Sequence, residues 1–177
     1  VQLEDILTPD FIKSKTSLSL GIVDGRNIWK NDFSHSLAII DRVVEKIGAA
    51  RVWIAPSCSL IHSPCDLDLE TNEQILTPEI KQWLAFAKQK IEEVVTLKKL
   101  STREDAEVTN IKWQNNIEAN ESRKTSKLIH NEEVKQRVAD ITEKDGQRNN
   151  IFSVRKIKQR ETLQLPILPT TTIGSFP

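Results

Sequence analysis

The sequence predicts an α/β fold that is helix-rich overall, and three observations support this. Two short runs of β-preferring residues, 17–23 and 52–55, are each followed by a segment with helical apolar spacing. The links between these segments are short, as in consecutive βα units. After residue 100, Glu, Lys, Arg, Asn and Gln dominate, which indicates polar helices. Alternation of strand and helix favours a parallel sheet or a (β/α) barrel.

The first expected βα unit is a strand over 17–23 and a helix over 32–47. Asn31 or Asp32 can accept a hydrogen bond from the first helical turn, and Gly48 is placed to end the helix. Apolar residues recur between them at alternating spacings of four and three, which is the pattern of one buried helix face. These positions are Phe33, Leu37, Ile40, Val44 and Ile47.

The second expected unit is a strand over 52–55 and one long helix over 78–100. Pro56 ends the strand because it has no amide hydrogen to donate to a sheet. Thr77 is the expected N-cap, and Pro78 takes the first helical position, where its missing N–H costs nothing. The apolar stripe of this helix consists of Ile80, Trp83, Leu84, Ala87, Ile91, Val94 and Val95.

Three polar helices are expected between residues 101 and 160. Ser101 and Glu104 form a capping-box pattern that begins the first helix. Asn131 caps the second, which is expected to end near Gly146, and Ser153 begins the third. Narrow apolar stripes of this kind suit helices on the outside of a larger body. In the first helix the apolar positions are Ala106, Ile111 and Ile117.

The last residues change character again. Residues 165–169, LPILP, are expected to be an extended linker, because each proline disfavours helix in the residue before it. Residues 170–173 are a β-branched run interpreted as a strand, which Gly174 ends. A hydroxyl and two backbone amides at the end of this strand could bind the polar head of a small molecule. An edge strand without a ligand explains the same residues equally well.

Composition excludes several classes of function. With 25 basic and 25 acidic residues there is no electrostatic case for nucleic acid or an anionic membrane, and the basic cluster at 155–160 is interpreted as a solvated helix face. No segment approaches 18 consecutive apolar residues, so no membrane span is expected. Two cysteines and no signal-peptide pattern indicate a cytoplasmic, reducing environment. The chain opens on Val1, without a methionine, and we expect it to be an interior piece of a longer protein.

Reactive side chains are concentrated just after the second strand. Cys58, His62 and Cys65 offer two thiolates and an imidazole, with Asp66 or Asp68 as a fourth ligand for zinc. The spacing matches no common zinc module, which favours a structural role in which Cys58 is partly buried and His62 bonds the backbone. Cys58 as a nucleophile would need His62 as its base, and no third group that orients this base is evident.

A second candidate lies at the end of the first strand. Arg26, within the turn Asp24-Gly25-Arg26-Asn27, could hold an anionic group of a ligand. A solvated turn between a strand and a helix explains the same residues, and the two interpretations are equally supported.

Four stretches resemble one family closely. They are 24–29 (DGRNIW), 53–60 (WIAPSCSL), 83–90 (WLAFAKQK) and 165–177 (LPILPTTTIGSFP). In order and separation they resemble cobalamin-independent methionine synthases, and the resemblance covers nearly the whole chain. Members of that family move a methyl group from 5-methyltetrahydropteroyltriglutamate to L-homocysteine, forming L-methionine without cobalamin. They contain two (β/α)8 barrels joined by helices.

The resemblance implies a domain assignment and a site. Residues 1–100 would be the last two βα units of the amino-terminal barrel, 101–164 the helical connection, and 165–177 the linker and first strand of the catalytic barrel. The family's zinc ligands lie on later strands of the catalytic barrel, so no metal ligand and no catalytic residue is expected here. The family's homocysteine-binding Ile-Gly-Ser matches Ile173, Gly174 and Ser175.

The resemblance also implies the partners. These are homocysteine, the methyl-folate and the remainder of the same polypeptide. The isolated chain is expected to associate with copies of itself and to have no activity of its own. Two alternatives remain from the residues alone: a small zinc-bound module at Cys58, His62 and Cys65, and a helical interaction scaffold at 101–160. Neither alternative explains the stretch 165–177.

Overall fold

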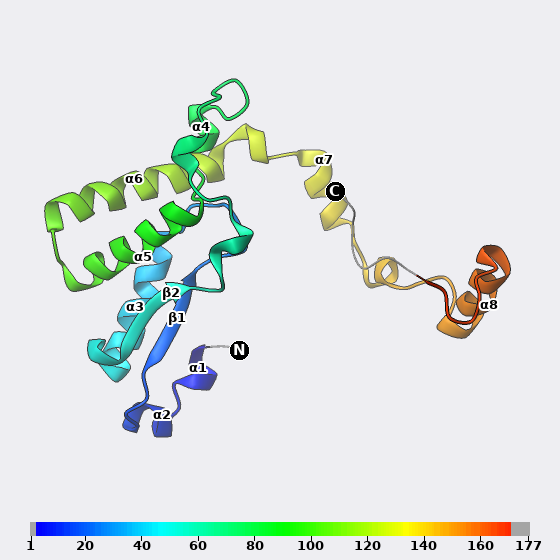
Figure 1. The fold of residues 1–177 in the computed structure, drawn as a ribbon, viewed down its shortest axis with the longest axis horizontal. Helices are drawn as coiled ribbons and strands as arrows, with labels where there is room; N and C mark the ends of the chain where they lie inside the picture. Colours follow the sequence, from blue (N-terminus) through cyan, green and yellow to red (C-terminus); the bar gives the residue numbers. More distant parts are fainter. Residues whose placement is uncertain (1–2, 171–177) are drawn as a thin grey trace. The chain divides into compact units, whose positions relative to one another are not determined.

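The computed structural model describes residues 3–170, which fall into two compact units, and the boundary along the chain lies between Ile129 and His130. The first unit contains both strands and the helices that pack on them (Figure 1). Its helices and strands are α1 (Leu3–Ile6), α2 (Pro9–Lys13), β1 (Leu18–Val23), α3 (Phe33–Ile47), β2 (Val52–Pro56), α4 (Pro78–Lys81), α5 (Ala87–Thr102) and α6 (Ala106–Thr125).

Strands β1 and β2 form a parallel pair, as the sequence predicts for two successive βα units. The register runs from Leu18 opposite Val52 and shifts by one residue before β1 ends. Gly21 lies just before this shift, and a Cβ there would be 2.9 Å from the Cα of Ser57. The close approach of the two backbones therefore requires glycine. The α/β class is confirmed by this sheet.

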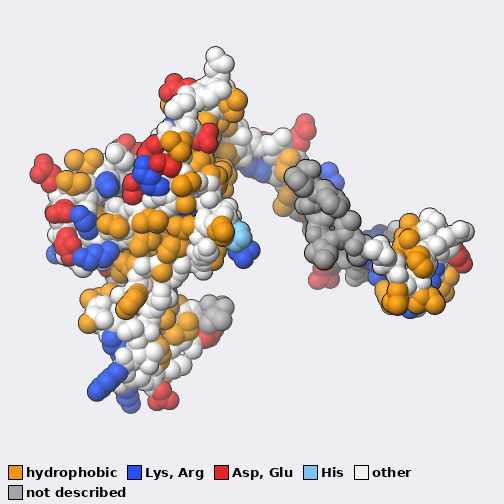
Figure 2. Space-filling view, viewed as in Figure 1, with side chains coloured by type: hydrophobic (Ala, Val, Ile, Leu, Met, Phe, Trp, Pro, Cys, Tyr) orange, Lys and Arg blue, Asp and Glu red, His pale blue; other side chains and the backbone are white. Residues whose placement is uncertain are grey.

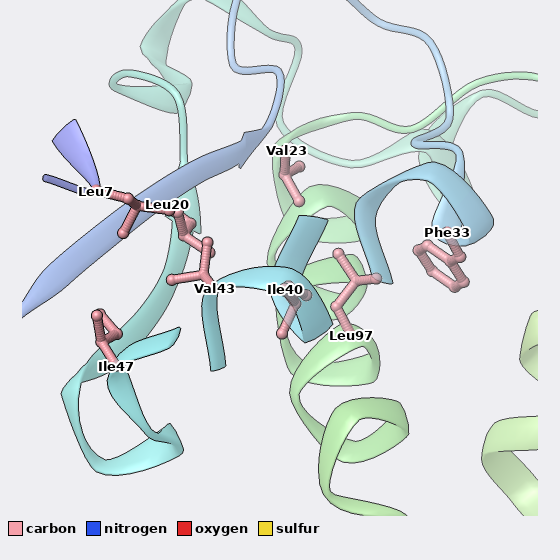
Figure 3. Packing of buried hydrophobic residues seen from close by; sticks show 8 residues of the cluster. All are labelled: Leu7, Leu20, Val23, Phe33, Ile40, Val43, Ile47 and Leu97. Carbon is pink, nitrogen blue, oxygen red and sulfur yellow. The ribbon is translucent and has the colours of Figure 1, made fainter. Parts of the chain in front are cut away.

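Helix α3 covers the sheet with the face that its spacing predicts. Asp32 is the N-cap, since its side chain accepts a hydrogen bond from the backbone N–H of His35 at 3.1 Å. Gly48 ends the helix in the left-handed region, with φ at 80°. Val43, which lies outside the expected stripe, is also fully buried. Figure 3 shows the resulting core, which consists of Leu7, Leu20, Val23, Phe33, Ile40, Val43, Ile47 and Leu97.

The expected single helix over 78–100 is wrong, because the chain forms two helices, α4 and α5. The start is as predicted: the side chain of Thr77 accepts a hydrogen bond from the N–H of Ile80. The break lies at 82–86, which contains Trp83 and Leu84 of the expected stripe. Trp83, Leu84 and Phe86 are all buried there.

Backbone pairing with the segment after β1 explains this break. The N–H of Lys30 donates to the carbonyl of Trp83, and the N–H of Ala85 donates to the carbonyl of Ile28, both at 2.8 Å. The carbonyl of Trp83 and the N–H of Ala85 therefore bond to the segment after β1 and not to other residues of a helix. Periodicity alone does not distinguish a helix from such a buried connecting segment.

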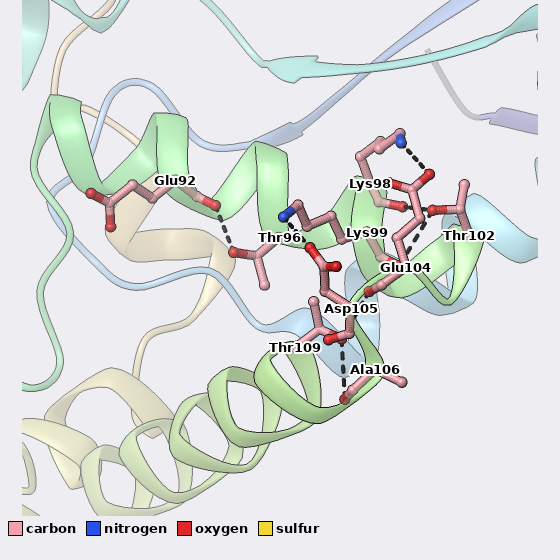
Figure 4. A network of polar contacts seen from close by, with 9 residues as sticks. All are labelled: Glu92, Thr96, Lys98, Lys99, Thr102, Glu104, Asp105, Ala106 and Thr109. Carbon is pink, nitrogen blue, oxygen red and sulfur yellow. Dashed lines mark hydrogen bonds and ion pairs between the residues drawn. The ribbon is translucent and has the colours of Figure 1, made fainter.

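The expected helix start at Ser101 is also wrong. Helix α5 continues through Ser101, whose hydroxyl donates to the carbonyl of Lys98. A turn follows, in which Arg103 and Asp105 adopt left-handed backbone conformations, with φ of 58° and 50°. Glu104 pairs with Lys98, and Asp105 with Lys99, so the turn is held by ion pairs with α5 and not by a capping box (Figure 4).

Helix α6 packs on α3 and α5 with a face that the apolar pattern does not predict. The expected apolar positions Ile111 and Ile117 are 59% and 39% exposed. Its buried residues are instead Thr109, Asn116 and Ala119. The contact of this helix with the rest of the first unit is therefore mainly polar.

The second unit contains α7 (Glu132–Ala139) and α8 (Phe152–Leu163). The side chain of Asn131 accepts from the N–H of Val134 at 3.1 Å, which confirms the predicted cap. Helix α7 ends earlier than the expected Gly146, and a separate 3-10 turn, Glu143–Gly146, follows it. Residues 165–169 have no regular secondary structure, as predicted for a linker. Within residues 3–170, no helix is long and apolar enough for a membrane span.

Apolar side chains remain exposed on β2 and α5, where Figure 2 shows hydrophobic groups gathered on the near face. Trp53 is 67% exposed, Ile91 56% and Val95 49%. Exposed patches of this kind drive association. We therefore predict that the isolated 177-residue chain self-associates in analytical ultracentrifugation. A monomer that unfolds cooperatively in calorimetry would contradict this prediction.

Candidate functional site

The loops that follow β1 and β2 lie against each other at the carboxyl ends of the strands. The N–H of Gly25 donates to the hydroxyl of Ser57 at 3.1 Å. A Cβ at Gly25 would be 2.8 Å from the carbonyl oxygen of Cys58 and 3.0 Å from its Sγ. Glycine is therefore needed here for the close approach of the two loops. The two loops that the sequence offers as separate candidates thus lie at the same edge of the sheet.

The turn after β1 is held by its own side chains. Asp24 accepts from the N–H of Arg26 at 2.8 Å and from the side-chain amide of Asn27 at 2.7 Å. Asn27 in turn accepts from the N–H of Trp29 at 3.0 Å. These bonds stabilise the turn without a ligand, and they leave the Arg26 side chain exposed. A role of Arg26 in binding an anion stays a hypothesis.

The loop after β2 does not gather its cysteines and histidine into a site. Cys58 is partly buried and its Sγ lies 3.6 Å from the carbonyl of Ser59, whereas His62 and Cys65 are exposed. Among residues 3–170 there is no group of three or more His, Cys, Asp or Glu side chains that could hold a metal ion. The partial burial of Cys58 agrees with the structural interpretation of this loop, but among residues 3–170 the side chain of His62 makes no hydrogen bond to the backbone.

The two aspartates considered as further ligands are paired with a lysine. The Nζ of Lys88 lies 2.9 Å from a carboxylate oxygen of Asp66 and 2.8 Å from one of Asp68. The hydrogen bond from Lys88 is the main reason that the pKa of Asp66 is lowered to about 2, with a smaller effect of the amide of Gln89. The residues that the resemblance assigns to homocysteine, Ile173, Gly174 and Ser175, lie outside the described residues.

A buried polar network that the sequence does not predict lies next to these loops, and Asn31 is its centre. The side-chain amide of Asn31 donates to the carbonyl of Ile22 at 2.8 Å, and its oxygen accepts from the hydroxyl of Ser36 at 2.7 Å. Its backbone N–H donates to Oε1 of Glu93 at 2.9 Å. One residue thus connects β1, α3 and α5.

Helix α6 is attached to the same segment through two asparagines. The amides of Asn116 and Asn120 donate to the carbonyl of Asn31 at 2.8 and 3.0 Å. The oxygen of Asn116 accepts from the N–H of Phe33 at 3.1 Å. Residues four apart share one face of a helix, so the Asn116 and Asn120 spacing is the signal that could have predicted this contact.

Three charged side chains surround the network. Lys90 is buried, and its Nζ donates to the carbonyl of Trp29 at 3.1 Å. Burial lowers the pKa of Lys90 and of Lys30. Burial also raises the pKa of Glu93 to about 7, although the hydrogen bond from Asn31 and the two nearby lysines oppose this change. Glu93 therefore titrates near neutrality.

This titration predicts a pH dependence of stability. The pKa of Glu93 is near 7 in the folded protein and near 4.5 in the unfolded chain. Between these pH values the folded state binds more protons, so the contribution of Glu93 to stability is lost as the pH rises from about 4.5 to about 7. The full loss is roughly 3 kcal/mol. When the pH is raised from about 5 to about 8, we expect the Glu93→Gln variant of the complete protein to lose less stability than the wild type.

Thermal unfolding at both pH values measures this difference. Glu92→Gln is the matched control, because Glu92 is the neighbouring carboxylate and is exposed. Parallel pH profiles for the wild type and Glu93→Gln would show that Glu93 titrates normally.

Comparisons with known proteins match the chain to one family. A family model described as cobalamin-independent synthase, N-terminal domain, matches residues 1–48. A 5-methyltetrahydropteroyltriglutamate–homocysteine methyltransferase of Flavobacterium johnsoniae is 59% identical over 177 residues, which are 100% of this chain and 23% of that protein. The methyltransferase of the same name from Cytophaga hutchinsonii is 56% identical over 99% of the chain and 23% of its own length.

A third relative with this name, from Nitrosomonas europaea, is 50% identical over 99% of the chain and 22% of its own length. The chain thus spans less than a quarter of these curated relatives. Because the similarity includes nearly every residue, it extends well beyond the region that the family model matches. The chain is therefore related over its whole length to the cobalamin-independent methionine synthases, as its motifs predict.

Proposed function

We propose that this chain is part of an enzyme that moves a methyl group from 5-methyltetrahydropteroyltriglutamate to L-homocysteine and forms L-methionine without cobalamin. The observation that carries the proposal is the 59% identity over all 177 residues to a methyltransferase with this substrate pair in its name. The relatives are several times longer, so we assign the activity to the complete polypeptide and not to this chain alone.

The domain assignment belongs to this proposal. The units β1–α3 and β2–α5 would close the amino-terminal (β/α)8 barrel, with 101–164 as the helical connection and 165–177 as the linker and first strand of the catalytic barrel. The parallel register of β1 and β2 supports a barrel of this kind, as does the meeting of their loops at one edge. A cytoplasmic location also belongs to this proposal.

We place the zinc of the resembling family on the remainder of the polypeptide, because the described residues offer no suitable group of ligands. Zinc bound there would hold the thiol of homocysteine as a thiolate, which is its nucleophilic form. In this chain, Ile173, Gly174 and Ser175 would bind the amino-acid end of homocysteine. Fixing that end orients the sulfur, and orientation can lower a bimolecular barrier by several kcal/mol.

Growth of a methionine auxotroph tests the proposal. A bacterial strain that lacks all of its own methionine synthases, grown without methionine or cobalamin, should grow when it expresses the complete protein. A strain that carries the empty vector is the control. Failure of a well-expressed complete protein to restore growth would contradict the proposed function.

The isolated chain should be inactive. We expect no methionine from purified residues 1–177 with homocysteine and the methyl-folate, because the ligands that activate the thiol and most of the barrel are not part of it. The check is mass-spectrometric detection of methionine, with the complete protein as the positive control. Turnover by the isolated chain would show that the activity resides in these residues.

A further inference from the structure

A cavity of 270 Å³ lies within the first unit, between α5, α6 and the segments around residues 30 and 84. Its volume is just below the roughly 300–1,000 Å³ of sites that hold drug-sized ligands, so it suits a smaller molecule. Charged, amide and apolar side chains all contribute to its lining. The cavity is formed entirely by residues other than those that the proposed function assigns to homocysteine.

Glu93 lines this cavity and has an unsatisfied oxygen. The residue is 6% exposed, and its Oε1 accepts the hydrogen bond from the N–H of Asn31. Its Oε2 is buried and has no hydrogen-bond partner among the described residues. A buried carboxylate oxygen without a donor is costly, and a hydrogen-bond donor on a bound molecule would satisfy it.

The same cavity carries positive charge and an apolar wall. Lys30 lines it and is partly buried, and Lys112 approaches from α6. Burial lowers the pKa of Lys30 while the charge of Glu93 opposes that change, so the two groups are close enough to interact. The apolar part of the lining comes from Phe33, Leu67 and Leu84.

We propose that this cavity binds a free α-amino acid with an apolar side chain. Its ammonium group donates to Oε2 of Glu93, its carboxylate lies near Lys30, and its side chain packs against Phe33, Leu67 and Leu84. A zwitterion of this kind pairs with the buried Glu93 and the partly buried Lys30 at once. The proposal concerns binding only, and it is independent of the proposed methyl transfer.

Calorimetric titration of the complete protein with L-leucine tests the proposal. Leucine has the required groups and is neither a substrate nor a product of the proposed reaction. Glu93→Gln is the informative variant, because the glutamine oxygen still accepts from Asn31 while an N–H₂ group replaces Oε2. We expect binding at least about tenfold weaker, the effect of losing a hydrogen bond to a charged group.

Matched controls make the result specific. Glu92→Gln removes the neighbouring, exposed carboxylate of the same cavity and should leave leucine affinity within about twofold. 4-Methylpentanoate lacks the ammonium group and 3-methylbutylamine lacks the carboxylate, so both should bind more weakly than leucine. Hydrogen exchange should slow on leucine binding in peptides that contain residues 28–33 and 84–93.

Two results would overturn the proposal. One is no leucine binding to the complete protein at millimolar concentration, which would mean that the cavity holds only water. The other is leucine binding that Glu93→Gln does not weaken, which would place the amino acid elsewhere. Loss of leucine binding and loss of methyl transfer are separate measurements, so this proposal and the proposed function can fail independently.

Discussion

Replacing Gly174 by Val in the complete protein should raise the KM for homocysteine by about 5- to 150-fold, the effect of forcing extra methyl groups into an occupied space. The reason is steric, since glycine has no Cβ and lets the backbone come within hydrogen-bonding distance of a ligand. If the amino-acid end of homocysteine binds at Ile173 to Ser175, a valine side chain takes up the space of that group. Steady-state kinetics with homocysteine as the varied substrate measures the change.

Ser175→Ala is the milder companion variant. It should cost about 0.5–1.5 kcal/mol if the hydroxyl bonds a neutral group, and up to roughly 3 kcal/mol if it bonds a charged one. If the complete protein binds zinc as proposed, its zinc content should be normal in both variants, because neither residue is among the proposed ligands. An unchanged KM and kcat in the Gly174→Val enzyme would return this segment to a structural role.

Replacing Asn31 by Ala should destabilise the complete protein by about 2–5 kcal/mol, the cost of leaving two buried polar groups without partners. The substitution removes the donor to the carbonyl of Ile22 and the acceptor for the hydroxyl of Ser36, which is buried. Bonds to the backbone of Asn31, from Asn116 among others, can persist. The thermal midpoint and hydrogen exchange of residues 28–36 report the effect.

Asn110→Ala is the matched control, because Asn110 is an exposed residue of α6. Its stability should stay within about 0.5 kcal/mol of the wild type. Equal stability of Asn31→Ala and Asn110→Ala would show that the network around Asn31 does not hold the first unit together.

The sequence predicts best those elements whose signals are local. The strand β1 and the helix α3 follow from side-chain periodicity, and hydrogen bonding within one turn limits the cap of α3 to Asn31 or Asp32, of which the structure uses Asp32. The cap at Asn131 is predicted for the same reason. Parallel pairing follows from the order of elements, since a helix between two strands is the usual crossover connection of parallel neighbours.

Elements that depend on distant partners are not predicted. The break between α4 and α5 exists because the backbone at Trp83 and Ala85 bonds residues 28–30, more than fifty residues away. Helix periodicity continues through this region, so no local signal marks the break. The start of α6 is missed because ion pairs from Lys98 and Lys99 to the turn compete with the capping box at Ser101.

The candidate site shows the same division. Glycine at position 25 is conspicuous as part of a turn, but only the structure shows that a Cβ there would meet Cys58. Charged residues are rarely buried in proteins, yet Lys90 and Glu93 are both buried and bond to the segment after β1. Polar contacts between distant residues have no period in a sequence, so spacing arguments cannot locate them.

The most direct test of the proposed function follows one methyl group. The purified complete protein would be incubated without cobalamin with L-homocysteine and 5-methyltetrahydropteroyltriglutamate that carries an isotope-labelled methyl group. We predict that the label appears in L-methionine and that the demethylated folate forms in equal amount. Label that remains on the folate, or that passes to an acceptor other than homocysteine, would contradict the account.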